Sequence, residues 1–88
     1  MNELRNIAVR IVTKHINNWD PEYLFADGAP DDEYESEIAK IVEAVLKSKD
    51  EIEVAEAIQD TFGYFFGRDY DFEDCYSIAK NVWKELYG

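Results

Sequence analysis

The spacing of apolar residues constrains the fold of this chain more than any other feature. In four segments, apolar side chains recur every three or four residues, which is the pattern of one face of an α-helix. The residues of these faces are Leu4, Ile7, Ala8, Ile11, Val12, Ile16 and Trp19; Tyr34, Ile38, Ile41, Val42, Val45 and Leu46; Val54, Ala55, Ile58, Phe62, Phe65 and Phe66; and Phe72, Cys75, Ile78, Ala79, Val82, Trp83 and Leu86. No segment shows the alternation that is typical of a strand. The chain is therefore predicted to be all-α.

Residues that favour helix ends separate the first two segments. Asn2 is a candidate cap for the first helix, which is expected to end near Asn17 and Asn18. Asp20 followed by Pro21 is typical of a helix start, and Gly28 is a candidate stop. These residues predict a short extra helix over residues 21–26, between the first and second main helices.

The later segments carry similar signals. Asp50 and Glu53 have the spacing of a capping box before the third helix, and Gly67 is expected to end it. Aromatic residues are concentrated between Phe62 and Tyr76, so the corner between helices three and four should hold the bulkiest part of the core. Four amphipathic helices with short connections predict a small antiparallel four-helix bundle, with residues 1–88 as a single domain.

Composition supports a folded domain in a reducing compartment. Hydrophobic residues make up 47% of the 88 residues, so the chain has the apolar material that a disordered acidic tail lacks. With Cys75 as the single cysteine, no internal disulfide is possible, and no signal peptide is recognisable. We therefore expect a cytoplasmic protein. The longest uncharged run, residues 61–67, is far too short to span a bilayer.

The net charge excludes one large class of functions. A chain with a formal charge of −11 is repelled by nucleic acid, because binding to phosphate backbones depends on Lys and Arg. Ordinary DNA or RNA binding is therefore not expected. Nearly all of the negative charge lies in two blocks, residues 20–37 and residues 50–74.

The first acidic block also carries aromatic rings and contains no Lys or Arg. Carboxylates beside aromatic side chains can form a surface that binds a basic protein. The predicted partner-binding carboxylates are Asp27, Asp31, Asp32, Glu33, Glu35 and Glu37, and the predicted aromatic anchors are Tyr23 and Tyr34. However, Trp19 and Tyr34 also fit core positions of helices. If those two rings are buried, Tyr23, Phe25 and the carboxylates remain for binding.

Other patterns have simpler explanations than chemistry. The acids from Asp69 to Asp74 resemble the start of a calcium loop, but the required glycine and final glutamate are replaced by Asp74 and Lys80. Glu33 and Glu37, one helical turn apart, are typical of a solvated face rather than an acid–base pair. We therefore predict no metal, no cofactor and no catalytic residue.

The only imidazole and the only thiol in the chain also fit structural roles. His15 is expected to be a hydrogen-bonded residue at the border of a helix face, and Cys75 a buried residue that packs as a small hydrophobe. One His and one Cys also supply too few ligands for a structural zinc site.

Several short motifs resemble the YugE-like family of small bacterial proteins. They are Trp19-Asp20-Pro21, the run from Gly28 to Glu37, Phe66-Gly67, and Cys75 followed by Ile78-Ala79. The resemblance covers most of the chain and implies a compact helical domain of this size. No activity is assigned to that family, so the resemblance provides no functional residues.

Together these patterns favour a non-enzymatic protein that binds a basic protein through an acidic face. Its most concrete form is an immunity-type inhibitor of a basic toxin. One alternative is a housekeeping or structural protein whose charge serves solubility. Another is a nucleic-acid mimic that inhibits a DNA-binding protein. We expect a monomer or a weak homodimer, because the net charge opposes self-association.

Overall fold

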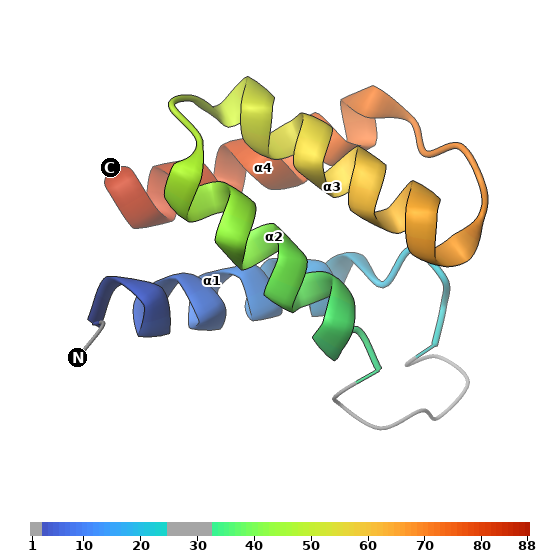
Figure 1. The fold of residues 1–88 in the computed structure, drawn as a ribbon, viewed down its shortest axis with the longest axis horizontal. Helices are drawn as coiled ribbons and strands as arrows, with labels where there is room; N and C mark the ends of the chain where they lie inside the picture. The colour runs from blue at the N-terminus through green and yellow to red at the C-terminus, as the bar shows by residue number, and fades with distance from the viewer. Residues whose placement is uncertain (1–2, 25–32) are drawn as a thin grey trace.

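The computed structural model describes residues 3–24 and 33–88, and it contains four helices (Figure 1). These are α1 (Glu3–Trp19), α2 (Glu35–Lys47), α3 (Glu51–Phe66) and α4 (Phe72–Tyr87). Helices account for 79% of the structure, and no strand occurs among the described residues. The predicted all-α fold is confirmed.

The helices form a ring in which each one packs against two others. Helix α1 contacts α2 and α4, and α3 contacts the same two helices from the opposite side. Successive helices run in opposite directions, as Figure 1 shows. The α1–α2 and α3–α4 connections therefore lie at one end of the bundle, and the α2–α3 connection lies at the other end with both termini. This is the antiparallel four-helix bundle that the sequence predicts.

The predicted short helix at residues 21–26 is not formed in its described part, because residues 21–24 form turns. Asp20 and Tyr23 have φ angles of 42° and 58°, in the left-handed region that interrupts a right-handed helix. The Asp20 amide donates to the Ile16 carbonyl at 2.9 Å and completes the last turn of α1. The predicted cap at Asn2 and stop at Gly28 lie outside the described residues.

Local hydrogen bonds define the ends of α3. The Asp50 side chain accepts from the Glu53 amide at 2.9 Å, as predicted. The Glu53 carboxylate accepts from the Lys49 amide at 3.0 Å, one residue earlier than a standard capping box requires. Gly67 ends the helix with a φ of 67°, a conformation that glycine adopts without steric cost.

Helices α2 and α4 begin in different ways. Helix α4 starts at an unpredicted cap, where the Asp71 side chain accepts from the Asp74 amide at 3.3 Å. Helix α2 begins at Glu35, with Glu35 and Glu37 in its first turn. The residue that precedes it, Tyr34, makes no side-chain capping bond, because its ring lies in the core.

The core lies between the four helices and is heaviest near the α3–α4 corner. The fully buried Phe62 ring lies 5.3 Å from Trp19, 5.8 Å from Tyr34, 5.6 Å from Phe66 and 5.5 Å from Tyr70, measured between centroids. We call these five residues the aromatic cluster. The other buried apolar residues are Ala8, Val12, Ile16, Ile38, Ile41, Val42, Val45, Val54, Ala55, Ile58, Cys75, Ala79 and Val82.

Three residues that were expected on the buried faces are exposed. Leu4 and Ile7 are 46% and 40% exposed, because α2 crosses α1 obliquely and diverges from its amino end (Figure 1). Phe65 is 38% exposed at the end of α3. No described helix has both the length and the apolar character needed to cross a membrane.

Replacing Phe62 with alanine tests the aromatic cluster. We expect Phe62→Ala to lower the free energy of unfolding by about 3–5 kcal/mol, since it removes a buried ring and leaves a cavity. Urea denaturation followed by circular dichroism measures this loss. The control is Glu56→Ala on the same helix, which should change stability by less than about 0.5 kcal/mol because Glu56 is exposed. Equal losses in the two variants would show that the cluster does not dominate the core.

Candidate functional site

Described residues of the first acidic block and the last part of the second block, residues 69–74, lie at one end of the bundle. The α1–α2 and α3–α4 connections lie at that end, so residues 19–24, 33–35 and 67–74 are brought together (Figure 1). We call these residues the acid end. Its carboxylates are Asp20, Glu22, Glu33, Glu35, Asp69, Asp71, Glu73 and Asp74, and Arg68 is its one cation among the described residues.

Arg68 is already neutralised by an ion pair. Its Nε donates to the Glu22 carboxylate at 2.8 Å, and its guanidinium lies 4.3 Å from the centre of the Tyr70 ring. The Tyr70 hydroxyl donates to the same Glu22 oxygen, and the second guanidinium nitrogen donates to the Pro21 carbonyl at 3.3 Å. We call Glu22, Arg68 and Tyr70 the Glu22 clasp. It ties the segment after α1 to the segment between α3 and α4.

The pKa values of two side chains in this clasp are raised. Burial, and then the hydrogen bond to Glu22, raise the pKa of Tyr70 to about 12. The hydrogen bond to Glu22 also raises the pKa of Arg68. Both donors are therefore held in the protonated forms that favour the contact.

Asp20 and Tyr34 make the second connection within the acid end. The Tyr34 hydroxyl donates to Asp20 Oδ1 at 2.6 Å and accepts from the Glu22 amide at 3.1 Å. The Leu24 amide donates to the same Asp20 oxygen at 2.9 Å. Burial, and then the bond to Asp20, raise the pKa of Tyr34 far above its ordinary value. Tyr34 thus fixes the conformation of residues 20–24 from inside the core.

The predicted binding residues are distributed unevenly. Tyr23 is 71% exposed, and Glu33 and Glu35 are exposed, so these three lie on the surface as predicted. Tyr34 is fully buried, and its expected role as a surface anchor is not compatible with this position. Glu37 is also buried, at 5% exposure, because it lies on the core face of α2. Asp27, Asp31, Asp32 and Phe25 lie outside the described residues.

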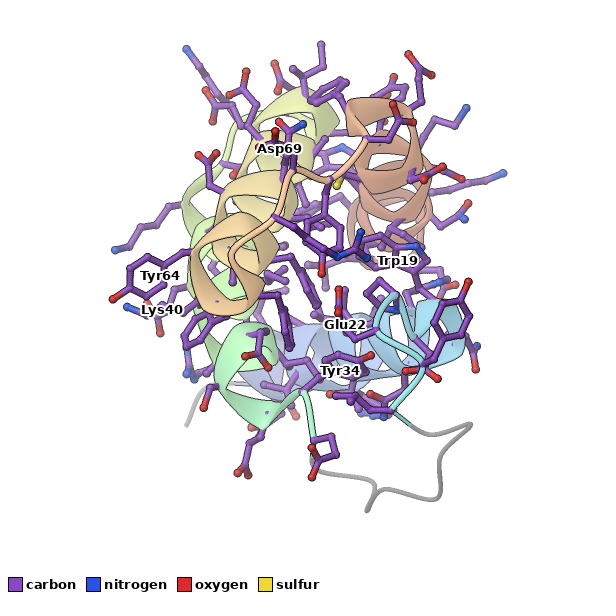
Figure 2. All side chains as sticks on the ribbon, turned by 90° about the vertical axis from the view of Figure 1, so that its right-hand side faces the viewer. Trp19, Glu22, Tyr34, Lys40, Tyr64 and Asp69 are labelled. Carbon is purple, nitrogen blue, oxygen red and sulfur yellow. The ribbon has the colours of Figure 1, made fainter. Side chains whose placement is uncertain are left out.

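A hollow of about 500 Å³ lies in the middle of the acid end. Its lining residues are Trp19, Asp20, Pro21, Tyr23, Arg68, Asp69, Tyr70, Asp71 and Asp74. Figure 2 looks onto this end of the molecule, with Trp19, Glu22, Tyr34 and Asp69 labelled. The hollow therefore combines aromatic walls with carboxylates that come from both blocks of the sequence. Sequence reasoning missed the contribution of Asp69, Asp71 and Asp74 to this surface, because only the path of the chain brings them beside Asp20 and Tyr23.

The carboxylates of the acid end are spread out rather than directed at one point. Among the described residues, no group of three or more His, Cys, Asp or Glu side chains is arranged to hold a metal ion. Such a dispersed set of carboxylates is suited to contacts with several cations on a partner surface.

The single histidine and the single cysteine have structural positions, as predicted. His15 Nε2 lies 2.7 Å from Glu85, which Lys14 also contacts at 2.7 Å. Lys14 and then His15 lower the pKa of Glu85. Cys75 is fully buried, and burial raises the pKa of its thiol to about 11, with smaller effects of Asp74 and Asp71. A thiol in this environment is not an activated nucleophile.

Comparison with known proteins assigns a family to most of the chain. A family model described as a domain of unknown function (DUF1871) matches residues 11–84, which include all of α2 and α3 and most of the other two helices. No curated protein and no solved structure matches the chain.

The alkaline pH dependence of stability tests the Glu22 clasp. The pKa of Tyr70 in the folded chain, about 12, lies above its ordinary value of 10.0. The stability that neutral Tyr70 contributes is therefore complete below pH 10 and is lost as the pH rises through 12. Urea denaturation of the parent chain and of Tyr70→Phe measures this contribution at each pH. A stability difference that stays constant from pH 9 to pH 12 would contradict the predicted linkage.

Replacing Glu37 tests the cost of a buried carboxyl group. Its Oε1 has no hydrogen-bond partner among the described residues. Burying an oxygen without a partner costs about 1–3 kcal/mol of desolvation. The dipole of α2 favours an acid in this first turn by only about 0.3–1 kcal/mol. We therefore expect Glu37→Met to increase the free energy of unfolding in urea. The exposed neighbour is the control: Glu35→Met should lower stability slightly, because it loses only the dipole interaction. A destabilised Glu37→Met variant would show that the carboxyl has a favourable partner.

Proposed function

The chain belongs to the DUF1871 family, whose function is unknown, and we propose that it is a non-enzymatic module that binds a basic protein through its acid end. One observation carries this proposal: carboxylates of the first acidic block and of residues 69–74 meet around a hollow whose one described cation, Arg68, is already paired with Glu22. Asp69 and Glu35, which are exposed and form no ion pair with a described residue, are therefore available to cations from outside. The narrower resemblance to the YugE-like proteins stays a prediction.

The chemistry of the surface fits binding. Carboxylates such as Asp69, Glu35 and Glu33 accelerate encounters with a positively charged surface, because opposite charges steer diffusion. The exposed ring of Tyr23 lies at the hollow and can supply contact area, as tyrosines commonly do at the centre of interfaces. The side chains most suited to catalysis have other positions, since His15 pairs with Glu85 and Cys75 is buried.

The most concrete form of this proposal is an immunity-type inhibitor of a basic toxin. A nuclease must present Lys and Arg to hold nucleic acid, so its active surface is positively charged. A compact bundle with one acidic end can cover such a surface. The Glu22 clasp supports this role because it holds the segment with Tyr23 in one conformation, which lowers the entropy lost on binding.

Affinity capture with charge variants tests the proposal. The bait proteins are the parent chain; an acid-end variant, Glu35→Lys with Asp69→Lys; and a control, Glu3→Lys with Glu56→Lys. Both variants change the net charge equally, and all four positions are exposed. A basic protein from the lysate of the source organism should bind the parent and the control, and bind the acid-end variant weakly. Its retention should fall between 50 and 300 mM salt.

Kinetic measurements with the purified partner then separate the roles of charge and contact. The acid-end variant should lower the association rate constant about tenfold or more and flatten its salt dependence. Tyr23→Ala should mainly raise the dissociation rate constant, because the ring forms contacts only in the complex. Equal binding of the parent and the acid-end variant would place the binding site elsewhere. If the parent captures no basic protein at either salt concentration, the charge serves solubility alone.

A further inference from the structure

A second surface lies on the flank of the bundle and contains no residue of the acid end. One hollow, of about 340 Å³, is lined by Lys40, Asp60, Thr61, Tyr64 and Phe65. Another, of about 490 Å³, is lined by Arg5, Ser36, Ala39, Lys40, Glu43 and Phe65. The two hollows share Lys40 and Phe65, so they form one continuous depression that crosses α2 from α1 to the end of α3. We call it the α2 furrow.

Two aromatic rings form the α3 side of this furrow. Tyr64 is 83% exposed and Phe65 is 38% exposed, and their rings pack edge to face with centroids 5.3 Å apart. Figure 2 shows Tyr64 and Lys40 projecting from the same flank of the molecule. Exposed aromatic side chains are enriched in protein interfaces, where each ring buries a large area.

The charges of the furrow are balanced, unlike those of the whole chain. Arg5 and Lys40 oppose Glu43 and Asp60, in a protein with a formal charge of −11. Arg5 and Glu43 already form an ion pair at 2.6 Å. Lys40 and Asp60 form no ion pair with another described residue, although they line the same hollow. Two copies of the chain can therefore meet at this flank without bringing like charges together.

We propose that the α2 furrow is the interface of a homodimer. In a two-fold symmetric interface the same patch of each subunit faces the other. The patch must therefore contain groups that attract the groups of an identical patch. The furrow does so, because Lys40 can face Asp60 of the partner subunit on both sides of the axis. The rings of Tyr64 and Phe65 then lie near the axis, where they are removed from water.

Dimerisation through the furrow is compatible with binding at the acid end. None of the residues that line the furrow belongs to the acid end. A dimer of this kind presents two acid ends, so it can engage a partner at two places and gain avidity. The two events should respond to salt in opposite ways. Salt screens the repulsion between two chains of charge −11 and favours the dimer, whereas it weakens attraction to a basic protein.

Sedimentation equilibrium over a range of protein concentrations tests the dimer. The average mass of the parent chain should rise from 10.3 kDa toward twice that value, and the rise should begin at lower concentrations in 300 mM salt than in 50 mM. Tyr64→Ala should raise the dissociation constant about tenfold or more. This residue is exposed in the monomer, so its replacement leaves folding intact.

A charge exchange identifies the interface. Lys40→Glu alone and Asp60→Lys alone should each raise the dissociation constant, because each places like charges across the axis. The double variant should restore the dissociation constant of the parent chain, since the exchanged charges again attract each other. Lys49→Glu and Glu56→Lys are exposed controls outside the furrow and should leave the constant within about threefold.

Three results would overturn the homodimer. The first is a mass of 10.3 kDa at every protein and salt concentration. The furrow would then contact a different protein or solvent. The second is a dimer whose dissociation constant changes no more with Lys40→Glu and Asp60→Lys than with their controls. The third is a double variant that dimerises as weakly as the two single variants. None of these outcomes bears on capture of a basic protein by the acid end.

Discussion

The packing around Phe62 is the constraint on which the rest of this structure depends. The end of the bundle that holds the aromatic cluster also holds the described acidic residues of both connections. Carboxylates gathered at one end repel one another, which opposes the compact state. Burial of large rings contributes about 1.5–3 kcal/mol for each side chain, more than an exposed pair of like charges costs. The apolar packing therefore permits an accumulation of charge that the surface alone would not tolerate.

The carboxylates of the acid end form two sets, those bonded within the protein and those that face solvent. Asp20 accepts hydrogen bonds from Tyr34 and Leu24, and Glu22 accepts them from Arg68 and Tyr70. These two acids are thus occupied by the protein itself. Asp69 and Glu35 are exposed and make no ion pair with a described residue, so their charges act outward. Because the occupied pair fixes the segment that carries Tyr23, the structural acids determine where the outward surface lies.

The sequence predicts most of the fold because helix formation depends on local spacing. The apolar pattern, the Asp50 cap and the stop at Gly67 correctly predict the main helices and the bundle. The turn at residues 20–24 was mispredicted, since Asp20-Pro21 is a good helix start on local grounds. Tertiary bonds to Tyr34 and Arg68 favour the left-handed backbone of Asp20 and Tyr23 instead.

The candidate site was predicted less well, because it depends on contacts between distant segments. An aromatic residue at helical spacing suits both a core and a surface anchor, and Tyr34 proved to be in the core. Residues 69–74 looked like an isolated acidic run, and only the antiparallel path brings them beside Asp20.

The acid end and the α2 furrow also differ in the range over which they act. Charges at the acid end act over about 8 Å at physiological salt, whereas the rings of the α2 furrow act only on contact. On the two proposals, a basic partner is therefore selected at a distance, while a second copy is recognised only after the two flanks meet.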